Sequence, residues 1–400
     1  MNGPREKFWV EINIAALRHN IREVQKHIGP GRHILFVVKS DGYGHGAVEV
    51  VRAALAEGVE SFGVATLAEG LTLRRAGISE EIVLLQPSLD FELEEVISAN
   101  LQPSLSDLAT ARRLSEMALG RPVHVHVEIN TGMNRMGFNP EAALADIPRI
   151  AKLPDIHLAG AFTHFRPITP ASLHETKRNL SVFNSIIEQL GAQGVHFPRL
   201  HTASSHAILY CPESYFDTIR PGLLMYGGYN GNLPPNGPLT EPVMACRCRV
   251  LHVRQIKKGE WVHYGENFQA PRNMTVAIIA AGYGAGYPKS LSNSGEVLIA
   301  GHRAKICGVV GMDMTIVDVS AHPSMLSGDM VTLLGVDGSD EITVAELAKN
   351  AATIPYEILC RLGRNLPRVF TYPAIGCVRN GSQFKAISGA TAPGVGSHSR

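Results

Sequence analysis

The fold is decided by the stretch Val37-Val38-Lys39-Ser40-Asp41-Gly42-Tyr43-Gly44-His45-Gly46. The apolar residues before Lys39 indicate a buried parallel strand, and the glycines after it indicate a turn into a helix that begins near Ala47. A lysine at the carboxyl end of a buried strand has apolar surroundings that lower its pKa, so its amine can form a Schiff base with a carbonyl compound. Tyr43 and the glycine backbone offer donors to a phosphate. A solvated lysine that only ends the strand is the alternative.

Strand-like and helix-like segments alternate on both sides of this stretch. An amphipathic helix is predicted over 15–28, and later helices include 67–76, 105–119 and 171–190. The other strands predicted before residue 229 are 61–65, 81–85, 101–103, 122–129, 156–162, 199–202 and 218–220. With the Lys39 strand they predict a closed (β/α)8 barrel of the TIM type, with active-site residues at the carboxyl ends of its strands.

The sequence changes character after Gly228. Residues 229–238 are rich in Gly, Pro and Asn, and the segments beyond them are β-branched strands joined by turns. The chain therefore divides into a barrel domain over 1–238, a mainly antiparallel β-rich domain over 239–385 and a disordered tail over 386–400. Residues 1–12 can pair with the second domain. One short helix is predicted at 344–350, and a strand-rich end follows to about residue 378.

Charge and composition point to a small-molecule partner. The formal net charge is +1, with no basic face of the kind that nucleic acid or anionic lipid requires. No apolar segment is long enough to span a membrane, and residues 1–9 lack the apolar core of a signal peptide. We therefore expect a cytoplasmic protein without a nucleic-acid or membrane partner. The six cysteines form no complete metal-binding pattern, so we expect buried free thiols and no metal.

Polar residues alternate with apolar ones along the predicted strand 122–129. His124, His126 and Glu128, with Asn130 just beyond, share one face, which in a barrel strand points inward. Buried polar groups need partners, and Arg135 is an obvious one for Glu128. The spacing fits a structural ion pair as well as a functional one.

Other candidate residues end the later strands. His164 follows one strand, where it could tune a neighbouring group or be a structural histidine. Ser205 begins a helix after the next strand, and Arg220 ends the eighth. The backbone N–H groups of Gly222 and Leu223, with the Ser205 hydroxyl, fit the phosphate site that barrels form after their last two strands.

Together these residues resemble one known family. The motifs that carry the resemblance are Val37-Val38-Lys39 with Tyr43-Gly44-His45-Gly46, Thr131-Gly132-Met133-Asn134-Arg135, Thr163-His164-Phe165, Arg220-Pro221-Gly222, Gly282-Tyr283, Met312-Asp313 and Tyr356-Glu357. They look like the bacterial alanine racemases, in family order, over about residues 8–375. The resemblance implies a pyridoxal 5'-phosphate enzyme of fold type III. It also implies a head-to-tail homodimer in which each active site takes residues from the partner's second domain.

The same resemblance implies catalytic roles. Lys39 would carry the cofactor and serve as the base on one face of the amino-acid substrate's α-carbon, while Tyr283 of the partner subunit would serve the opposite face. Racemisation requires two such groups, because a proton removed from one side must be returned to the other. His164 would polarise Tyr283. Arg220 would face the pyridine nitrogen and keep it deprotonated, which disfavours transamination.

Binding roles follow from the resemblance as well. The residues that would hold the phosphate are Tyr43, Ser205, Tyr356 and the amides of Gly222 and Leu223. Arg135 and the Met312 backbone would position the phenolic oxygen and the substrate carboxylate. Where the family commonly has a carbamylated lysine, this chain has Glu128. We hypothesise that this carboxylate orients Arg135 without CO2.

Further departures from the family pattern leave the substrate open. Ser40-Asp41-Gly42, Ser204, Gly284-Ala285, Val309 and Gly311 differ from the residues that the family commonly has, with a trend toward less charge and less bulk. Alanine is the expected substrate, and serine or a larger amino acid is the alternative. Two other activities fit less well. A non-catalytic pyridoxal-phosphate-binding barrel would lack the second domain, and a decarboxylase of similar architecture would have a cysteine-containing substrate loop.

Overall fold

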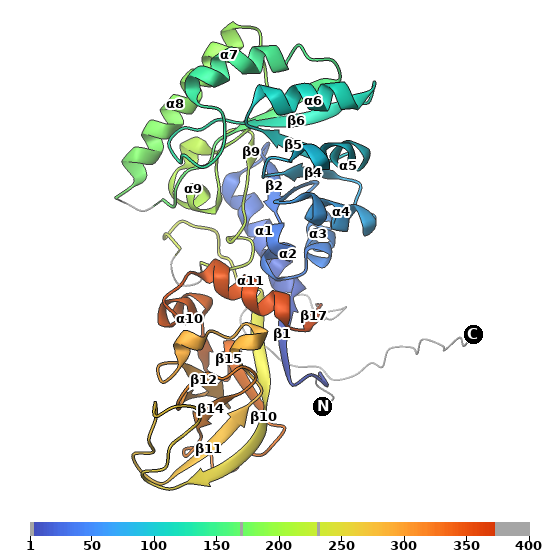
Figure 1. Ribbon diagram of the computed structural model, residues 1–400. Coiled ribbons are helices and arrows are strands. Elements are labelled where there is room, and N and C mark those ends of the chain that lie inside the picture. Colours follow the sequence, from blue (N-terminus) through green and yellow to red (C-terminus); the bar gives the residue numbers. More distant parts are fainter. Residues whose placement is uncertain (1–3, 169–170, 230–232, 373–400) are drawn as a thin grey trace, which may run out of the picture.

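Eight parallel strands form the first of two bodies, the upper one in Figure 1. The computed structural model describes residues 4–168, 171–229 and 233–372. The barrel strands are β2 (His33–Val37), β3 (Ser61–Val64), β4 (Glu81–Leu84), β5 (Gln102–Leu105), β6 (Val123–Glu128), β7 (Ile156–Phe162), β8 (Arg199–His201) and β9 (Thr218–Ile219). Their order is β8-β7-β6-β5-β4-β3-β2-β9, and a parallel bridge between Ser204 and Arg220 joins the two ends. The predicted barrel is confirmed.

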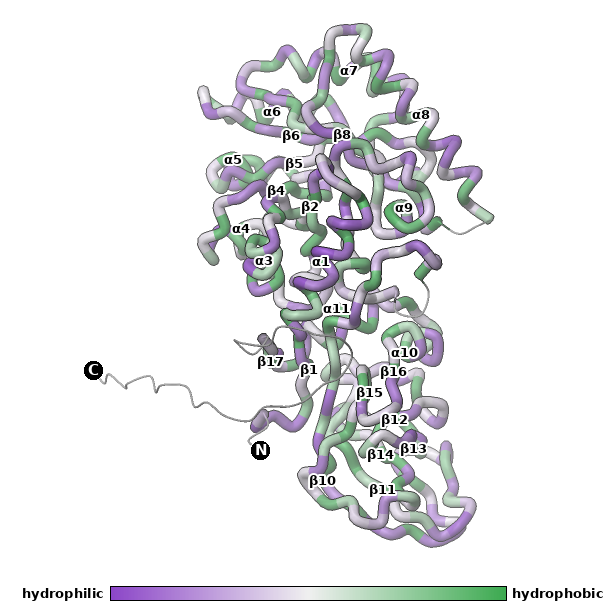
Figure 2. The backbone as a smooth tube through the Cα atoms, turned by 180° about the vertical axis from the view of Figure 1, so that it is seen from behind, coloured by the Kyte–Doolittle hydropathy of each residue, from purple (hydrophilic) through white to green (hydrophobic). Residues whose placement is uncertain are grey.

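Helices cover the outside of the barrel. They are α1 (Ile14–Ile28), α3 (Ala47–Leu55), α4 (Leu67–Arg75), α5 (Leu93–Ser98), α6 (Leu108–Ala118), α7 (Pro140–Ile150), α8 (Leu173–Ala192) and α9 (Ser205–Tyr210), with 3-10 turns η1 (Asp90–Glu92) and η2 (Pro212–Ser214). The segment α2 (Lys39–Tyr43) is a turn after β2, because its inner residues have positive φ. Hydrophobic and hydrophilic residues alternate along α8 in Figure 2, and its buried side chains include Leu180, Phe183, Ile186 and Leu190. This spacing places one apolar face against the barrel.

The second body is a nine-stranded sheet below the barrel. Its strands are β1 (Phe8–Asn13), β10 (Met244–Ile256), β11 (Met274–Ile279), β12 (Glu296–Ile299), β13 (His302–Lys305), β14 (Thr315–Asp318), β15 (Met330–Asp337), β16 (Asp340–Ile342) and β17 (Arg368–Thr371). β1 lies between β10, which runs antiparallel to it, and β17, which runs parallel. The first strand of the chain therefore belongs to this sheet, and α1 follows it directly with Asn13 as its N-cap.

The strand-rich end predicted after residue 350 is wrong over residues 355–365. These residues form the helix α11 (Pro355–Asn365), which packs against the correctly predicted α10 (Val344–Asn350). Pro355 stands in the first turn of α11, and Ile358, Leu359 and Leu362 are its buried face. The sequence signal was therefore present, but it was mistaken for a strand. The predicted tail and the chain beyond residue 372 lie outside the described residues.

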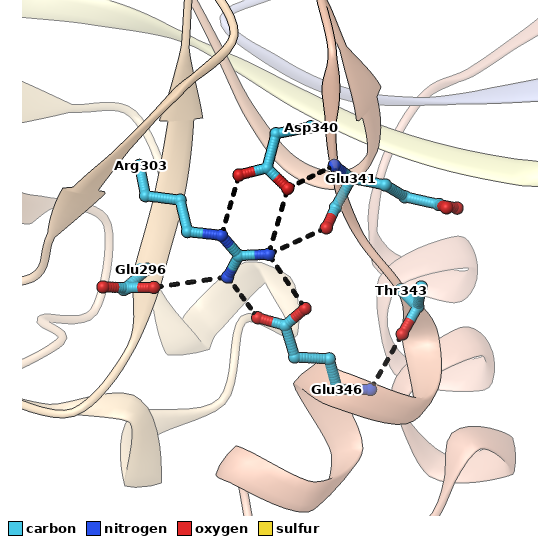
Figure 3. Close-up of polar contacts among 6 residues, drawn as sticks. All are labelled: Glu296, Arg303, Asp340, Glu341, Thr343 and Glu346. Atoms are coloured by element: carbon cyan, nitrogen blue, oxygen red, sulfur yellow. Dashed lines mark hydrogen bonds and ion pairs between the residues drawn. The ribbon is translucent and has the colours of Figure 1, made fainter. Parts of the chain in front are cut away.

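An arginine network ties α10 to the sheet. Figure 3 shows the Arg303 guanidinium between the carboxylates of Asp340, Glu346 and Glu296. Its Nε lies 2.9 Å from Asp340 Oδ2, and an NH2 hydrogen goes to the Glu341 carbonyl. One cation thus joins β12, β13, β16 and the first turn of α10. Several carboxylates around a single planar guanidinium make a more specific link than an isolated surface pair.

The described cysteines have no disulfide. Cys211, Cys246, Cys248 and Cys307 are buried and Cys360 is half-buried. Cys377 lies outside the described residues. Among the residues described here, no helix has both the length and the apolar character needed to cross a membrane.

Candidate active site

The turn after Lys39 has a left-handed backbone. Ser40, Asp41, Gly42 and Tyr43 have φ values of 53°, 54°, 63° and 53°. Each non-glycine residue in this region costs roughly 1–2 kcal/mol, so such a turn persists only where surrounding contacts impose it. The glycine-rich sequence predicted a turn, but its handedness is a finding of the structure.

Three charged side chains hold this turn. Glu69 at the start of α4 accepts a hydrogen bond of 2.7 Å from the Ser40 amide. Asp41 accepts from the Ala47 amide at 2.8 Å and forms an ion pair with Arg368 of β17. The Arg368 Nε also donates to the carbonyl of Gly44. Contacts from both bodies therefore fix the position of Lys39.

Helix α11 closes over the same turn. A Cβ on Gly44 would lie 2.4 Å from the Leu359 carbonyl oxygen, and a Cβ on Gly363 would lie 2.0 Å from the Gly44 oxygen. Only glycine permits two backbones to approach this closely. The helix that the sequence analysis missed thus packs directly on the active-site turn, and it brings Tyr356 with it.

The Lys39 side chain is half-buried at the carboxyl end of the barrel strands. Burial lowers its pKa, and the nearby Arg135 cation lowers it further, while the Glu69 carboxylate acts in the opposite direction. A larger fraction of the amine is therefore neutral than for a solvated lysine. This environment agrees with the nucleophilic lysine predicted from the sequence.

Hydroxyl groups gather around the backbone at Gly222. Ser205 Oγ accepts hydrogen bonds from the amides of Gly222 at 2.9 Å and Leu224 at 3.2 Å. A Cβ at Gly222 would lie 2.5 Å from the Tyr43 hydroxyl, and the Tyr43 and Tyr356 ring centroids are 5.8 Å apart. The structure therefore brings the predicted phosphate-binding groups together. It also shows that the Gly222 amide already has an acceptor within the chain.

Arg220 is buried at the centre of the site. One terminal nitrogen donates to the His201 carbonyl and lies 3.0 Å from His201 Nδ1, and the other donates to the Thr163 carbonyl at 2.7 Å. Burial lowers its pKa to about 10, which leaves the guanidinium protonated at neutral pH. In the described part of the chain, its Nε has no hydrogen-bond partner. One donor therefore remains for a ligand.

His164 stands beside this cation. Its Nδ1 lies 3.5 Å from an Arg220 terminal nitrogen, and the residue is half-buried. Burial, Arg220 and Arg135 lower the pKa of His164 to about 3. The imidazole is therefore neutral near pH 7.

Glu128 lies on the barrel interior below Arg135. It is 4% exposed, and its Oε2 has no hydrogen-bond partner among the described residues. Burial raises its pKa, while Arg220 and Arg135 lower it. Arg135 itself is exposed, so the direct ion pair suggested by the sequence is not formed in this chain. Of the polar residues predicted to face inward, His126 is buried, while His124 lies exposed at the far end of the barrel.

Tyr283 and Met312 lie apart from these groups, in the second body. Tyr283, in the 3-10 turn η3 (Tyr283–Ala285), donates its amide to the Gly311 carbonyl, and its side chain is 37% exposed. Met312 is 57% exposed. Tyr264 is also exposed on this body, at 78%. Its neighbour His263 lies against Gly311, whose carbonyl accepts from the Tyr283 amide.

The fold and the site together define a class of protein. A (β/α)8 barrel with a half-buried lysine and a buried arginine at the carboxyl ends of its strands, followed by a β-domain, is an arrangement for enzymatic chemistry on a small molecule. Models of the alanine racemase N-terminal and C-terminal domains match residues 12–230 and 243–370. This chain belongs to the alanine racemase family.

Individual relatives agree with this assignment. The alanine racemase of Desulforamulus reducens is 36% identical over 92% of this chain and 99% of its own length. The structure of alanine racemase from Clostridium difficile 630 has a TM-score of 0.88 and 32% identity, over 92% of this chain and 97% of that one. The alanine racemase of Bartonella henselae, solved with covalently bound pyridoxal phosphate, has a TM-score of 0.81 and 26% identity, over 92% of this chain and all of that one. The family resemblance is confirmed, while the residue roles remain predictions.

We expect acid to destabilise the protein before its carboxylates titrate. Burial lowers the pKa of His126 and His201, and it lowers that of His45 to about 4 and that of His164 to about 3. The unfolded chain protonates its histidines near pH 6.5 and so binds more protons than the folded chain below that pH. The free energy of unfolding should therefore fall from about pH 6.5 toward pH 4, by up to about 1.4 kcal/mol per pH unit for each histidine that stays neutral.

Urea unfolding at pH 7.5, 6.5 and 5.5, at one protein concentration, measures this slope. His164→Asn should reduce the slope, whereas His124→Asn should leave it unchanged because His124 is exposed. A free energy of unfolding that stays constant from pH 7.5 to pH 5.5 would contradict the expectation.

Proposed function

We propose that this protein interconverts L-alanine and D-alanine with pyridoxal 5'-phosphate as its cofactor. The observation that carries the proposal is the Lys39 amine, whose pKa is lowered, beside the hydroxyl groups around Gly222 and the Arg220 guanidinium. Membership of the alanine racemase family supports the same reading.

The residues of the site fit this cofactor. The Ser205 and Tyr43 hydroxyls and the Leu223 amide, which has no acceptor among the described residues, are donors for a phosphate. The Tyr356 hydroxyl would add a further donor from α11. When bound, the cofactor withdraws electrons from the substrate's α-carbon and so makes its proton removable. No group of three or more metal-ligating side chains occurs in the part of the chain that the structure describes.

Lys39 would transfer a proton at the substrate's α-carbon, and Arg220 would contact the cofactor's ring nitrogen. The Lys39 amine, with its lowered pKa, would hold or release a proton on one face of the substrate's α-carbon. Arg220 stays protonated and has only Nε–H left to offer. It would donate that hydrogen to the pyridine nitrogen and supply no proton to it, because a guanidinium is rarely deprotonated.

The opposite face of the α-carbon requires a group that this barrel does not supply. We propose that a partner subunit supplies a phenol and that the chain works as a homodimer. Tyr264, Tyr283, Met312 and Met314 are large side chains exposed on one body, which supports an interface there. We propose Tyr283, the phenol that the family resemblance predicts. Its side chain is 37% exposed on this body, and the more exposed Tyr264 is the alternative.

The function is tested by adding L-alanine and then D-alanine to the purified protein with pyridoxal 5'-phosphate and following optical rotation. The optical rotation should decay to zero whether the reaction starts from L-alanine or from D-alanine. Lys39→Ala should abolish this decay. A panel of enantiomers that includes serine and larger amino acids defines the preferred substrate. Cofactor binding without racemisation would indicate a binding protein, and CO2 release would indicate a decarboxylase. Either result contradicts the proposal.

The two phenols are separated by matched substitutions. Tyr283→Phe should lower the racemisation rate by about 10²-fold or more, the usual contribution of a positioned acid or base. Exchange of the α-proton of one enantiomer with D2O should persist, because Lys39 still serves one face. Tyr372→Phe is the control, since Tyr372 is an exposed tyrosine elsewhere on the chain. If Tyr264→Phe has the larger effect, Tyr264 is the acting phenol.

Mixing tests whether the site is shared between subunits. Lys39→Ala and Tyr283→Phe chains are each inactive in this scheme, but their heterodimer contains one intact site. An equal mixture should recover about a quarter of the wild-type rate after subunit exchange, as expected for random pairing in a two-fold dimer. No recovery in exchanged mixtures would contradict the shared site.

Glu128 is proposed to orient Arg135 as a fixed carboxylate. The two side chains form no direct ion pair in this structure, so the role rests on the burial of Glu128 in the barrel interior, with Oε2 free, and on the nearby Arg220 and Arg135 cations, which lower its pKa. Glu128→Gln keeps the shape and removes the charge, so kcat should fall about tenfold, equivalent to about 1.4 kcal/mol. Glu128→Lys should regain activity with added bicarbonate, while the wild type should not respond. Unchanged turnover in Glu128→Gln defeats the idea.

A further inference from the structure

A line of polar side chains crosses the barrel interior from Arg220 to its opposite end. We call it the interior relay: Arg220, His201, His126, Gln102 and Glu81. Arg220 NH1 lies 3.0 Å from His201 Nδ1, and His201 Nε2 lies 2.8 Å from His126 Nδ1. His126 Nε2 lies 2.9 Å from Gln102 Oε1 and 3.7 Å from Glu81 Oε1. Four strands thus contribute one hydrogen-bonded line.

The groups at the two ends of the interior relay determine which ring nitrogen of His201 and of His126 carries the hydrogen. Arginine can only donate, so His201 Nδ1 must accept and its hydrogen must be on Nε2. That hydrogen goes to His126 Nδ1, so the hydrogen of His126 is on Nε2 and points to Gln102 and the Glu81 carboxylate, which can only accept. Burial keeps both imidazoles neutral by lowering their pKa values. All donors therefore point from Arg220 toward Glu81.

Packing holds both rings in this arrangement. Phe162 stacks on His201 with ring centroids 4.9 Å apart and an interplanar angle of 14°. A Cβ on Gly160 would lie 2.6 Å from His126 Nδ1, so the His126 ring needs a glycine on the neighbouring strand. A buried row of polar groups is costly unless it is fully satisfied, and barrel interiors are usually filled with branched apolar side chains.

The far end of the interior relay meets solvent. Glu81 forms an ion pair with Arg199 and accepts from Ser61 Oγ at 3.0 Å. Burial tends to raise the pKa of Glu81, but its contacts with His126 and Arg199 outweigh this and lower it, so the carboxylate is charged. Glu81 and Gln102 line a cavity of about 600 Å³ at this end, together with Arg199. The negative charge at the mouth is therefore permanent near neutral pH.

We propose that Glu81, His126 and His201 are positioning residues for Arg220. The directed hydrogen bonds of the interior relay keep His201 Nδ1 as an acceptor, which holds one terminal nitrogen of Arg220. The Thr163 carbonyl holds the other terminal nitrogen, which leaves Nε as the donor without a partner among the described residues. The inference rests on the proposed function, because that function places the cofactor's ring nitrogen opposite Arg220. A reversed His201 tautomer would put a hydrogen against the guanidinium and turn it away.

Two variants interrupt the interior relay at different points. Glu81→Gln replaces the acceptor-only end by a group that also donates, at a mouth residue where folding is little disturbed. His126→Phe removes the middle of the line. His126→Asn restores an acceptor at the Nδ1 position and should rescue His126→Phe. His124→Phe is the matched control on the same strand, because His124 is exposed and outside the interior relay.

The first readout is nitrogen-15 NMR of histidine-labelled protein, which reports the tautomer without turnover. The wild type should show His201 with protonated Nε2 and unprotonated Nδ1. Glu81→Gln and His126→Phe should show mixed or reversed tautomers, and His126→Asn and His124→Phe the wild-type pattern. An unchanged His201 tautomer in both interrupted variants overturns the proposal, and melting temperatures verify that each variant is folded.

The second readout is the visible absorption and the kinetics of the cofactor-loaded enzyme. His126→Phe should shift the cofactor absorption and lower kcat about tenfold, a typical effect of removing an outer hydrogen-bond partner, with KM for alanine nearly unchanged. A tautomer change with no effect on absorption or kcat also overturns the proposal. If the wild type does not racemise, the NMR and absorption results still decide the positioning role, so the two failures are distinguishable.

Discussion

The active site depends on the left-handed turn that follows Lys39. A chain of L-residues does not adopt four such conformations in succession without external contacts. Here those contacts come from Glu69 of the barrel, Arg368 of the second body and the backbone of α11 at Gly363. The second body is therefore part of the active site of its own chain, because the position of Lys39 is set only when α11 and β17 are docked.

The charges in the site interact strongly because the fold holds them close together. Lys39, Arg135 and Arg220 are three cationic side chains in one space, with Glu128 among them. Burial and mutual repulsion lower the pKa of the lysine, which has an amine to deprotonate, whereas the buried arginine remains charged. One geometry thus lowers the pKa of an amine and keeps a permanent cation beside it. A group with a shifted pKa beside a fixed charge is typical of functional sites.

Much of the molecule could be predicted from its residues, and the misses have physical causes. The barrel strands were found because short apolar runs such as β2 and β4, or the alternation of polar and apolar residues in β6, stand between turn and helix signals. Helix α11 was missed because its apolar face is short and follows β-branched segments, although Pro355 marked its start.

The sequence by itself determined the barrel, the second β-domain and the family, because periodicity and motif order are local properties of the chain. Only the tertiary structure decided the handedness of the turn after Lys39, the missing contact between Glu128 and Arg135, and the joining of His126 and His201 into one line beneath Arg220. These features depend on side chains from distant strands meeting in one interior. No spacing along the chain encodes such distances, because closure of the barrel and docking of α11 set them.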